Sequence, residues 1–219
     1  MATVITAGNA TNGLSLSADN TGSFDFKTGS GAGISAMTIS SSQVVSIPGS
    51  LTVVGTLTAT GGVSGSIRSG TAVASTSGTS IDFTSLPTGI KRITVMFSNV
   101  SLSLNESYLI QLGTGSTTYT TSGYTATSTL GTAGGNSIYT STSGFIMGTA
   151  LAAGFASGQM VLTNITGNSW VSSSVLKRGT DGVLMSSGDV ALGAVLTAVR
   201  ITSNGTSTFD SGTINILFE

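Results

Sequence analysis

The chain has 219 residues, of which only 7% are charged, and its net charge is −1. Soluble proteins usually contain about 25% charged residues, so this surface offers no long-range attraction to nucleic acid or to an anionic membrane. The lack of cysteine and histidine excludes disulfides, a Ser-His-Asp triad and the commonest metal ligands. A hydrophobic fraction of 39%, rich in Val, Ile and Leu beside Thr, indicates a folded β-rich protein and not a disordered one.

The abundance of Ser, Thr and Gly in place of Lys and Glu bears on assembly. Short side chains lose less rotamer entropy when they are ordered, by up to about 2 kcal/mol for each Lys or Glu replaced. A net charge near zero also weakens the repulsion that keeps molecules apart. The composition therefore indicates a component of a larger assembly.

Residues 1–66 form a series of very short predicted strands. The stretches LSLS (14–17) and SFDFK (23–27) alternate apolar and polar residues, and ISAMTIS (34–40) and VVSI (44–47) follow them. This segment has too few large apolar residues to bury a core of its own. We interpret it as an N-terminal attachment arm that packs on other copies of the chain, on a partner surface or on the C-terminal domain.

The end of this arm, IPGSLTVVGTLTATGGVSGS (47–66), repeats every six residues, with an aliphatic residue at Leu51, Leu57 and Val63. Six is an even step, so on a β-strand these side chains point to the same face. The spacing predicts a short threefold β-shaft in which Leu51, Leu57 and Val63 are trimer or attachment contacts. The alternative is a plain two-stranded meander in which the repeat is an accident of composition.

Residues 67–219 show longer alternating strands, which predict a C-terminal domain. Turn signals at 166–168, 180–182 and Asn204-Gly205 predict hairpins, the last being the strongest two-residue signature. The spacing favours an all-β, antiparallel β-sandwich or jelly-roll-like domain. The stretch 189–199 is the one plausible helix, with Asp189 as its N-cap. Predicted strands lie at 90–100, 107–113, 159–165, 169–176, 198–203, 206–210 and 213–219.

The sequence carries little that indicates chemistry. Its eight carboxylates are scattered singly, mostly at turns or strand ends, where Asp has an ordinary structural use. A polysaccharide hydrolase would need two of them to converge in a cleft. We therefore expect no enzyme activity, no catalytic residue, no cofactor and no metal. The most apolar window, 145–162, is interrupted by Gly and Ser and has no flanking charge cluster, so no membrane span is expected.

The segment between Gly113 and Phe145 is the best candidate for a contact surface. Tyr119, Tyr124 and Tyr139 punctuate a run of Ser, Thr and Gly, a mixture that binding loops favour. These tyrosines are candidate receptor-contact residues. The alternative, which we favour, is that each tyrosine anchors a strand to the core with its hydroxyl at the rim.

Two regions of the chain resemble virion proteins of tailed bacteriophages, especially fibre-like ones. The N-terminal ITAGNATNGLSLSADNTGSFDFKTGSGAGISAMTISSSQVVSIPGSLTVVGTL resembles their N-terminal segments, and SIDFTSLPTGIKRITVMFSNVSLS and TFDSGTINILFE resemble their C-terminal modules. The resemblance implies a non-catalytic homotrimer with a β-rich core, made in the bacterial cytoplasm and displayed on the virion surface. It carries over no functional residue, because the group has no fixed catalytic motif.

Two roles within this group compete. A capsid decoration (cement) protein would clamp the shell as a trimer and contact the major capsid protein. A short tail fibre or receptor-binding protein would contact tail proteins and recognise the host surface, with a surface glycan as a candidate ligand. The short shaft favours decoration. In either case the expected partners are other copies of the chain and virion proteins, and neither nucleic acid nor a membrane.

Overall fold

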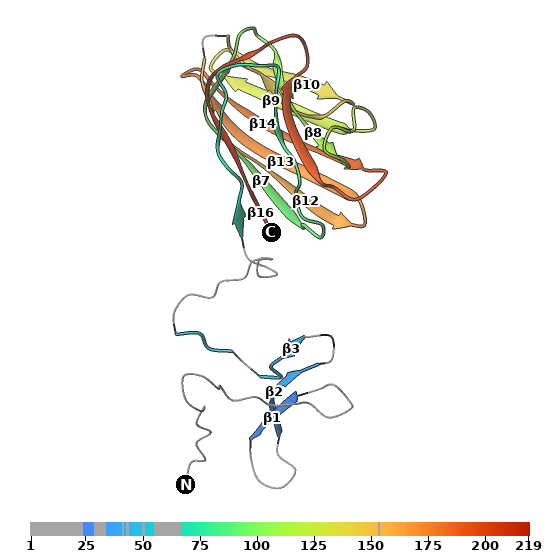
Figure 1. The fold of residues 1–219 in the computed structure, drawn as a ribbon. Helices are drawn as coiled ribbons and strands as arrows, with labels where there is room; N and C mark the ends of the chain where they lie inside the picture. The colour runs from blue at the N-terminus through green and yellow to red at the C-terminus, as the bar shows by residue number, and fades with distance from the viewer. Residues whose placement is uncertain are drawn as a thin grey trace. The chain divides into compact units, whose positions relative to one another are not determined.

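A computed structural model of the chain describes residues 24–28, 34–40, 42, 44–49, 51–54, 67–152 and 154–219. It is all-β: every strand pairing is antiparallel, and these ranges contain no helix. The chain divides into two compact units, Met1–Thr60 and Gly61–Glu219. Figure 1 shows the strands of each unit.

The N-terminal unit contains a three-stranded antiparallel sheet. Its strands β1 (Phe24–Thr28), β2 (Ile34–Ile39) and β3 (Val45–Ser46) pair in the order β1-β2-β3. These strands confirm the predictions for 23–27, 34–40 and 44–47. The predicted strand at 14–17 lies outside the described residues, as do Leu57 and Val63. Leu51 and the residues up to 54 are described and belong to no strand.

The C-terminal unit has two antiparallel sheets, consistent with a β-sandwich. The larger has the order β10-β9-β14-β13-β12-β7-β16-β4, with β5 also on β16, and the smaller has the order β11-β8-β15-β6. The strands are β4 (Arg68–Ser69), β5 (Val73–Ala74), β6 (Ser80–Phe83), β7 (Arg92–Leu102), β8 (Ser107–Gly113), β9 (Thr125–Thr132), β10 (Gly135–Ser141), β11 (Phe145–Thr149), β12 (Ala156–Thr166), β13 (Ser169–Arg178), β14 (Gly182–Ala191), β15 (Ala198–Ser203) and β16 (Phe209–Phe218).

The core lies between the two sheets and follows the predicted alternation. On β7 the side chains of Ile93, Val95 and Phe97 are buried, and on β16 those of Ile214 and Ile216 are buried. Facing residues of the smaller sheet complete one hydrophobic cluster with them. Alternation with a period of two places these side chains on one face of each strand. Burial of that face stabilises the fold by about 25 cal/mol for each Å² of apolar surface removed from water.

Two of the three predicted hairpins are confirmed. The strands β12 and β13 pair around the turn at 166–168, and β13 and β14 pair around the turn at 180–182. The third is wrong: β15 pairs with β6 and β8, whereas β16 pairs with β7 in the other sheet. The Asn204-Gly205 turn therefore carries the chain from one sheet to the other, because β15 and β16 each form backbone ladders with strands that are distant in sequence.

Two further expectations are corrected. The plausible helix at 189–199 is not formed: its first residues end β14, its last residues begin β15, and Gly193 lies between them. The segment 113–145 is not only loop, since it contains the paired strands β9 and β10. The described residues include no helix long and apolar enough to cross a membrane, and the apolar window 145–162 contributes β11 and the first part of β12.

Candidate interaction surfaces

Exposed aliphatic side chains gather in the last described part of the N-terminal unit. Leu51 is 60% exposed and Val54 is 99% exposed, and neither is drawn into a hydrophobic cluster. Exposure of single apolar residues is common, but several exposed apolar residues in one short segment are typical of a contact surface. No charged residue occurs between positions 34 and 54. The other exposed aliphatic residues of this segment are Val44, Val45, Ile47 and Val53.

Tyr124 is a core residue and not a surface contact. Its side chain is 2% exposed and packs edge-on against Phe145, with 5.0 Å between the ring centroids. Its hydroxyl accepts a hydrogen bond of 2.8 Å from the Leu112 backbone N–H. Burial raises the pKa of Tyr124 to about 12, so the ring stays neutral. The enclosed Tyr124 fits the favoured alternative, an anchor to the core, and not a receptor contact, because its aromatic ring fills the core beside β8.

Tyr119 belongs to a charged cluster with Arg200 and Asp82. The Arg200 guanidinium donates two hydrogen bonds to Asp82, at 2.8 and 2.7 Å, and its Cζ lies 4.0 Å from the centroid of the Tyr119 ring. Burial and the Asp82 charge raise the pKa of Tyr119. The Tyr119 hydroxyl is buried and has no hydrogen-bond partner of good geometry among the described residues. The ring therefore covers an ion pair that bridges β15 and β6.

Tyr139 lies on β10, the outermost strand of the larger sheet. Its side chain is half-buried and packs against the hydrophobic core, while the next residue on the other face, Ile138, is 70% exposed. Tyr119 and Tyr139 are each partly exposed, and their role as receptor contacts stays a prediction. The three tyrosines do not form one surface, since Tyr124 is enclosed.

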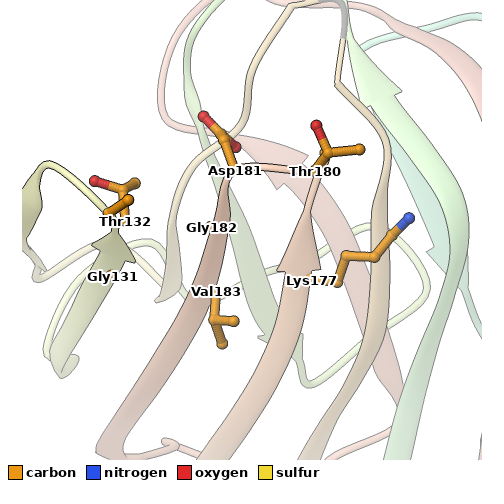
Figure 2. Close-up of a pocket in the computed structure, with 9 residues that line it drawn as sticks. Gly131, Thr132, Lys177, Thr180, Asp181, Gly182 and Val183 are labelled. Atoms are coloured by element: carbon orange, nitrogen blue, oxygen red, sulfur yellow. The ribbon is translucent and has the colours of Figure 1, made fainter.

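A shallow open depression of about 690 Å³ lies beside two turns of the larger sheet. Figure 2 shows side chains from the end of β9, such as Thr132, and from the β13–β14 turn, such as Thr180 and Asp181. Arg178 donates a hydrogen bond of 2.6 Å to Asp181, and this interaction lowers the pKa of Asp181. Lys177 also lines the depression. Amino, hydroxyl and carboxylate groups of this kind can hydrogen-bond a polyol.

Most of the described carboxylates already have a partner. Ion pairs hold three of them, and no group of acidic residues suited to a metal ion occurs in the described part of the chain. Glu106 accepts hydrogen bonds from backbone N–H groups, and Asp210 accepts one from the Ser101 hydroxyl. The ion pairs are Arg92–Glu219, Arg178–Asp181 and Arg200–Asp82. These carboxylates connect neighbouring strands or hold turns.

Sequence reasoning missed Ile138 and the Arg200–Asp82 pair. The strand around Ile138 reads GNSIYTS, which looks like loop because it has only one aliphatic residue. The two charges are 118 positions apart in the chain, so no local pattern connects them. Only the pairing of β15 with β6 brings them side by side.

The fold and these surfaces define an all-β protein of antiparallel sheets, without an identifiable catalytic constellation in its described residues. Comparison of the chain with protein-family models, with curated proteins and with solved structures finds no match.

Proposed function

We propose that this chain is a non-enzymatic structural protein on the outside of a bacteriophage virion, a trimeric capsid decoration protein that stabilises the shell. The observation that carries the proposal is the uncharged N-terminal segment with exposed aliphatic side chains, Leu51 and Val54 among them. Burial of each such side chain against another chain contributes about 1.5–3 kcal/mol. Where many copies bind across the contact between neighbouring shell subunits, that contact is hard to open, because all the copies must detach together.

Most carboxylates of the C-terminal unit form ion pairs or hydrogen bonds within the fold, which supports a structural role. The composition supports it too, because Ser and Thr surfaces lose little entropy when they are immobilised against neighbours. In this proposal the N-terminal arm attaches to the major capsid protein and to sister chains, and the C-terminal unit projects outward.

A short tail fibre that recognises the host surface is the second candidate. The open depression beside Lys177 and Thr132 favours it, since its polar groups suit the hydroxyls of a surface glycan. In that case the N-terminal arm would bind tail proteins and form the shaft.

The copy number of the chain relative to the major capsid protein, in purified particles of the phage that encodes it, tests both roles. A number in the hundreds supports decoration, and a few dozen or fewer supports a tail appendage. Absence from the particle would contradict both.

A double variant and a control test the attachment surface itself. We expect the protein that carries both Leu51→Asp and Val54→Asp to be incorporated less into particles, because burial of a carboxylate without a partner is costly. Val195→Asp is the matched control, because Val195 is 50% exposed in the C-terminal unit. Equal incorporation of the two proteins would contradict the attachment role of this segment.

A further inference from the structure

The two sheets of the C-terminal unit have four edges, and one of them is unlike the others. The strand β10 is the outermost strand of the larger sheet, and no described strand pairs with its outer side. It is seven residues long, GNSIYTS, and carries neither a charge nor a proline. Alternate backbone N–H and C=O groups along such a strand point away from β9 and are free to pair with another strand.

The other three edges carry the features that usually prevent strand addition. At the far end of the larger sheet, β4 and β5 are only two residues long, and β4 contains Arg68. In the smaller sheet, β6 is four residues long and contains Asp82. The last edge, β11, is irregular, since its register with β8 shifts and Gly148 has a φ of +73°. Short strands, charges and bulges are the protection that β10 lacks.

The centre of β10 also bears the most exposed large apolar side chain of the C-terminal unit, Ile138 at 70%. Strand register places it in a row across the outer face of the sheet: Ile138 is opposite Thr129, Thr129 is opposite Met185, and Met185 is opposite Val175. Met185 and Val175 are 49% and 58% exposed. This uncharged row of three apolar residues and Thr129 therefore runs to the free edge and stops there.

We propose that β10 pairs antiparallel with β10 of a second copy of this chain, with the twofold axis at Ile138. Ile138 is the middle residue of Gly135–Ser141, so this register is the one that pairs all seven residues. It places Ile138 opposite its own counterpart and Asn136 opposite Thr140 of the second copy. The two uncharged rows then become one continuous row, with the two Ile138 side chains at its centre, and no like charges meet.

The area of such a contact sets its strength. One seven-residue strand is about 24 Å long at about 3.4 Å per residue, and a contact of this size falls in the class of weak interfaces, below about 1,200 Å² in total. A single pair of strands is therefore transient. It becomes effective where other contacts hold many copies close together. On a decorated shell it would join neighbouring trimers laterally, but the contact does not depend on that role.

The lack of native cysteine allows a direct test by disulfide trapping in the full-length chain. Opposite residues of an antiparallel pair have Cα atoms about 4.5–5.5 Å apart, within the range of about 4.4–6.8 Å that a disulfide spans. Under mild oxidation, we expect Ile138→Cys to form a covalent dimer at least about tenfold faster than a cysteine that meets its counterpart only by collision. Ile165→Cys is the matched control, since Ile165 is 64% exposed.

A second set of variants tests the register. Neither Asn136→Cys nor Thr140→Cys should dimerise alone, because each lies four residues from its counterpart in the second copy, about 13 Å along the strand. A mixture of the two proteins should form a covalent dimer. The proposal is overturned if Ile138→Cys is trapped no faster than Ile165→Cys, or if Asn136→Cys alone is trapped as fast as the mixture. A denaturing gel reads these dimers whether or not the chain joins a virion, so failure here is distinct from failure of the proposed function.

Discussion

The carboxylate of Glu106 accepts a hydrogen bond of 2.9 Å from the backbone N–H of Ser207, although the two residues are 101 positions apart in the chain. It also accepts hydrogen bonds from the Thr206 N–H, at 2.9 Å, and from the Ser203 hydroxyl, at 2.8 Å. We call this set the Glu106 clamp. It holds the turn at which the chain leaves β15 in the smaller sheet and passes to β16 in the larger sheet.

The Glu106 clamp predicts a loss of stability in acid. Burial acts to raise the pKa of Glu106, but the hydrogen bonds from Ser207, Thr206 and Ser203 outweigh it and lower the pKa from 4.5 to about 2. A lowered folded-state pKa stabilises the fold above the unfolded value, and the stabilisation is lost as the pH falls from 4.5 towards 2. We expect the difference in unfolding free energy between the wild type and Glu106→Gln to shrink across this window. Urea denaturation at a series of pH values measures it.

The matched control for this experiment is Asp189→Asn. The Asp189 side chain is exposed and makes no hydrogen bond or ion pair with other described residues. A Glu106→Gln difference that stays constant between pH 5 and pH 2 would contradict the clamp.

Gly205 leaves room for this carboxylate. A Cβ atom at position 205 would lie 2.2 Å from Oε1 of Glu106, so Gly205→Ala has to displace the carboxylate from its donors. We expect a loss of about 1–2 kcal/mol in unfolding free energy. In a Glu106→Ala background the same substitution should be nearly neutral, since the clamp is already gone. A double-mutant cycle by chemical denaturation measures this coupling.

Gly193→Ala is the control for the cycle, because a Cβ there would have no neighbour within 4 Å. Equal effects of Gly205→Ala in the two backgrounds would show that Glu106 and Gly205 act independently, against the prediction.

The Tyr124 hydroxyl predicts a cost for a minimal substitution. Tyr124→Phe keeps the ring beside Phe145 but leaves the buried Leu112 N–H without its acceptor. An unsatisfied buried donor costs about 1–3 kcal/mol, and the melting temperature should fall accordingly. Tyr139→Phe is the comparison, since that hydroxyl makes no hydrogen bond in the described structure, and its effect should stay within about 0.5 kcal/mol. Equal melting temperatures of the two variants would exclude a structural role for the Tyr124 hydroxyl.

The stacked ion pair of Arg200 predicts that lysine is a poor substitute there. Lysine keeps the charge but loses the two parallel hydrogen bonds to Asp82 and the flat contact with Tyr119. We expect Arg200→Lys to lower the unfolding free energy by about 1 kcal/mol. Arg92→Lys, at the Arg92–Glu219 pair where the arginine side chain is 49% exposed against 31% for Arg200, should change it less. Denaturation in urea compares them, and an equal loss in both would mean that the Tyr119 stacking contributes nothing.

Local pattern was sufficient for the strands with strong alternation. The predicted strand at 90–100 corresponds to β7, and its alternating residues Ile93, Val95 and Phe97 are buried, because the side-chain period of a strand is a local property. The turns at 166–168 and 180–182 likewise join strands that pair with each other. The candidate site was predicted less well, since Tyr124 is enclosed and Ile138 was overlooked.

The strand β9 shows why the rest could not be read locally. Its inward residues are Ala126, Ser128 and Leu130, and only the last has a large apolar side chain. The local sequence pattern of this segment indicates a strand only weakly, and the segment forms one because β14 and β10 pair with it on both sides.

The sequence by itself determined the all-β class, the faces of the strongly alternating strands and the low overall charge, since these depend on composition and on a period of two. Only the tertiary structure decided that Asn204-Gly205 links two sheets, that Arg200 meets Asp82 and that β10 ends its sheet at an unprotected edge. The physical reason is that strand pairing depends on the apolar area buried and the backbone hydrogen bonds formed between segments that are distant in sequence. The free energy of these contacts outweighs the conformational preference of any single turn.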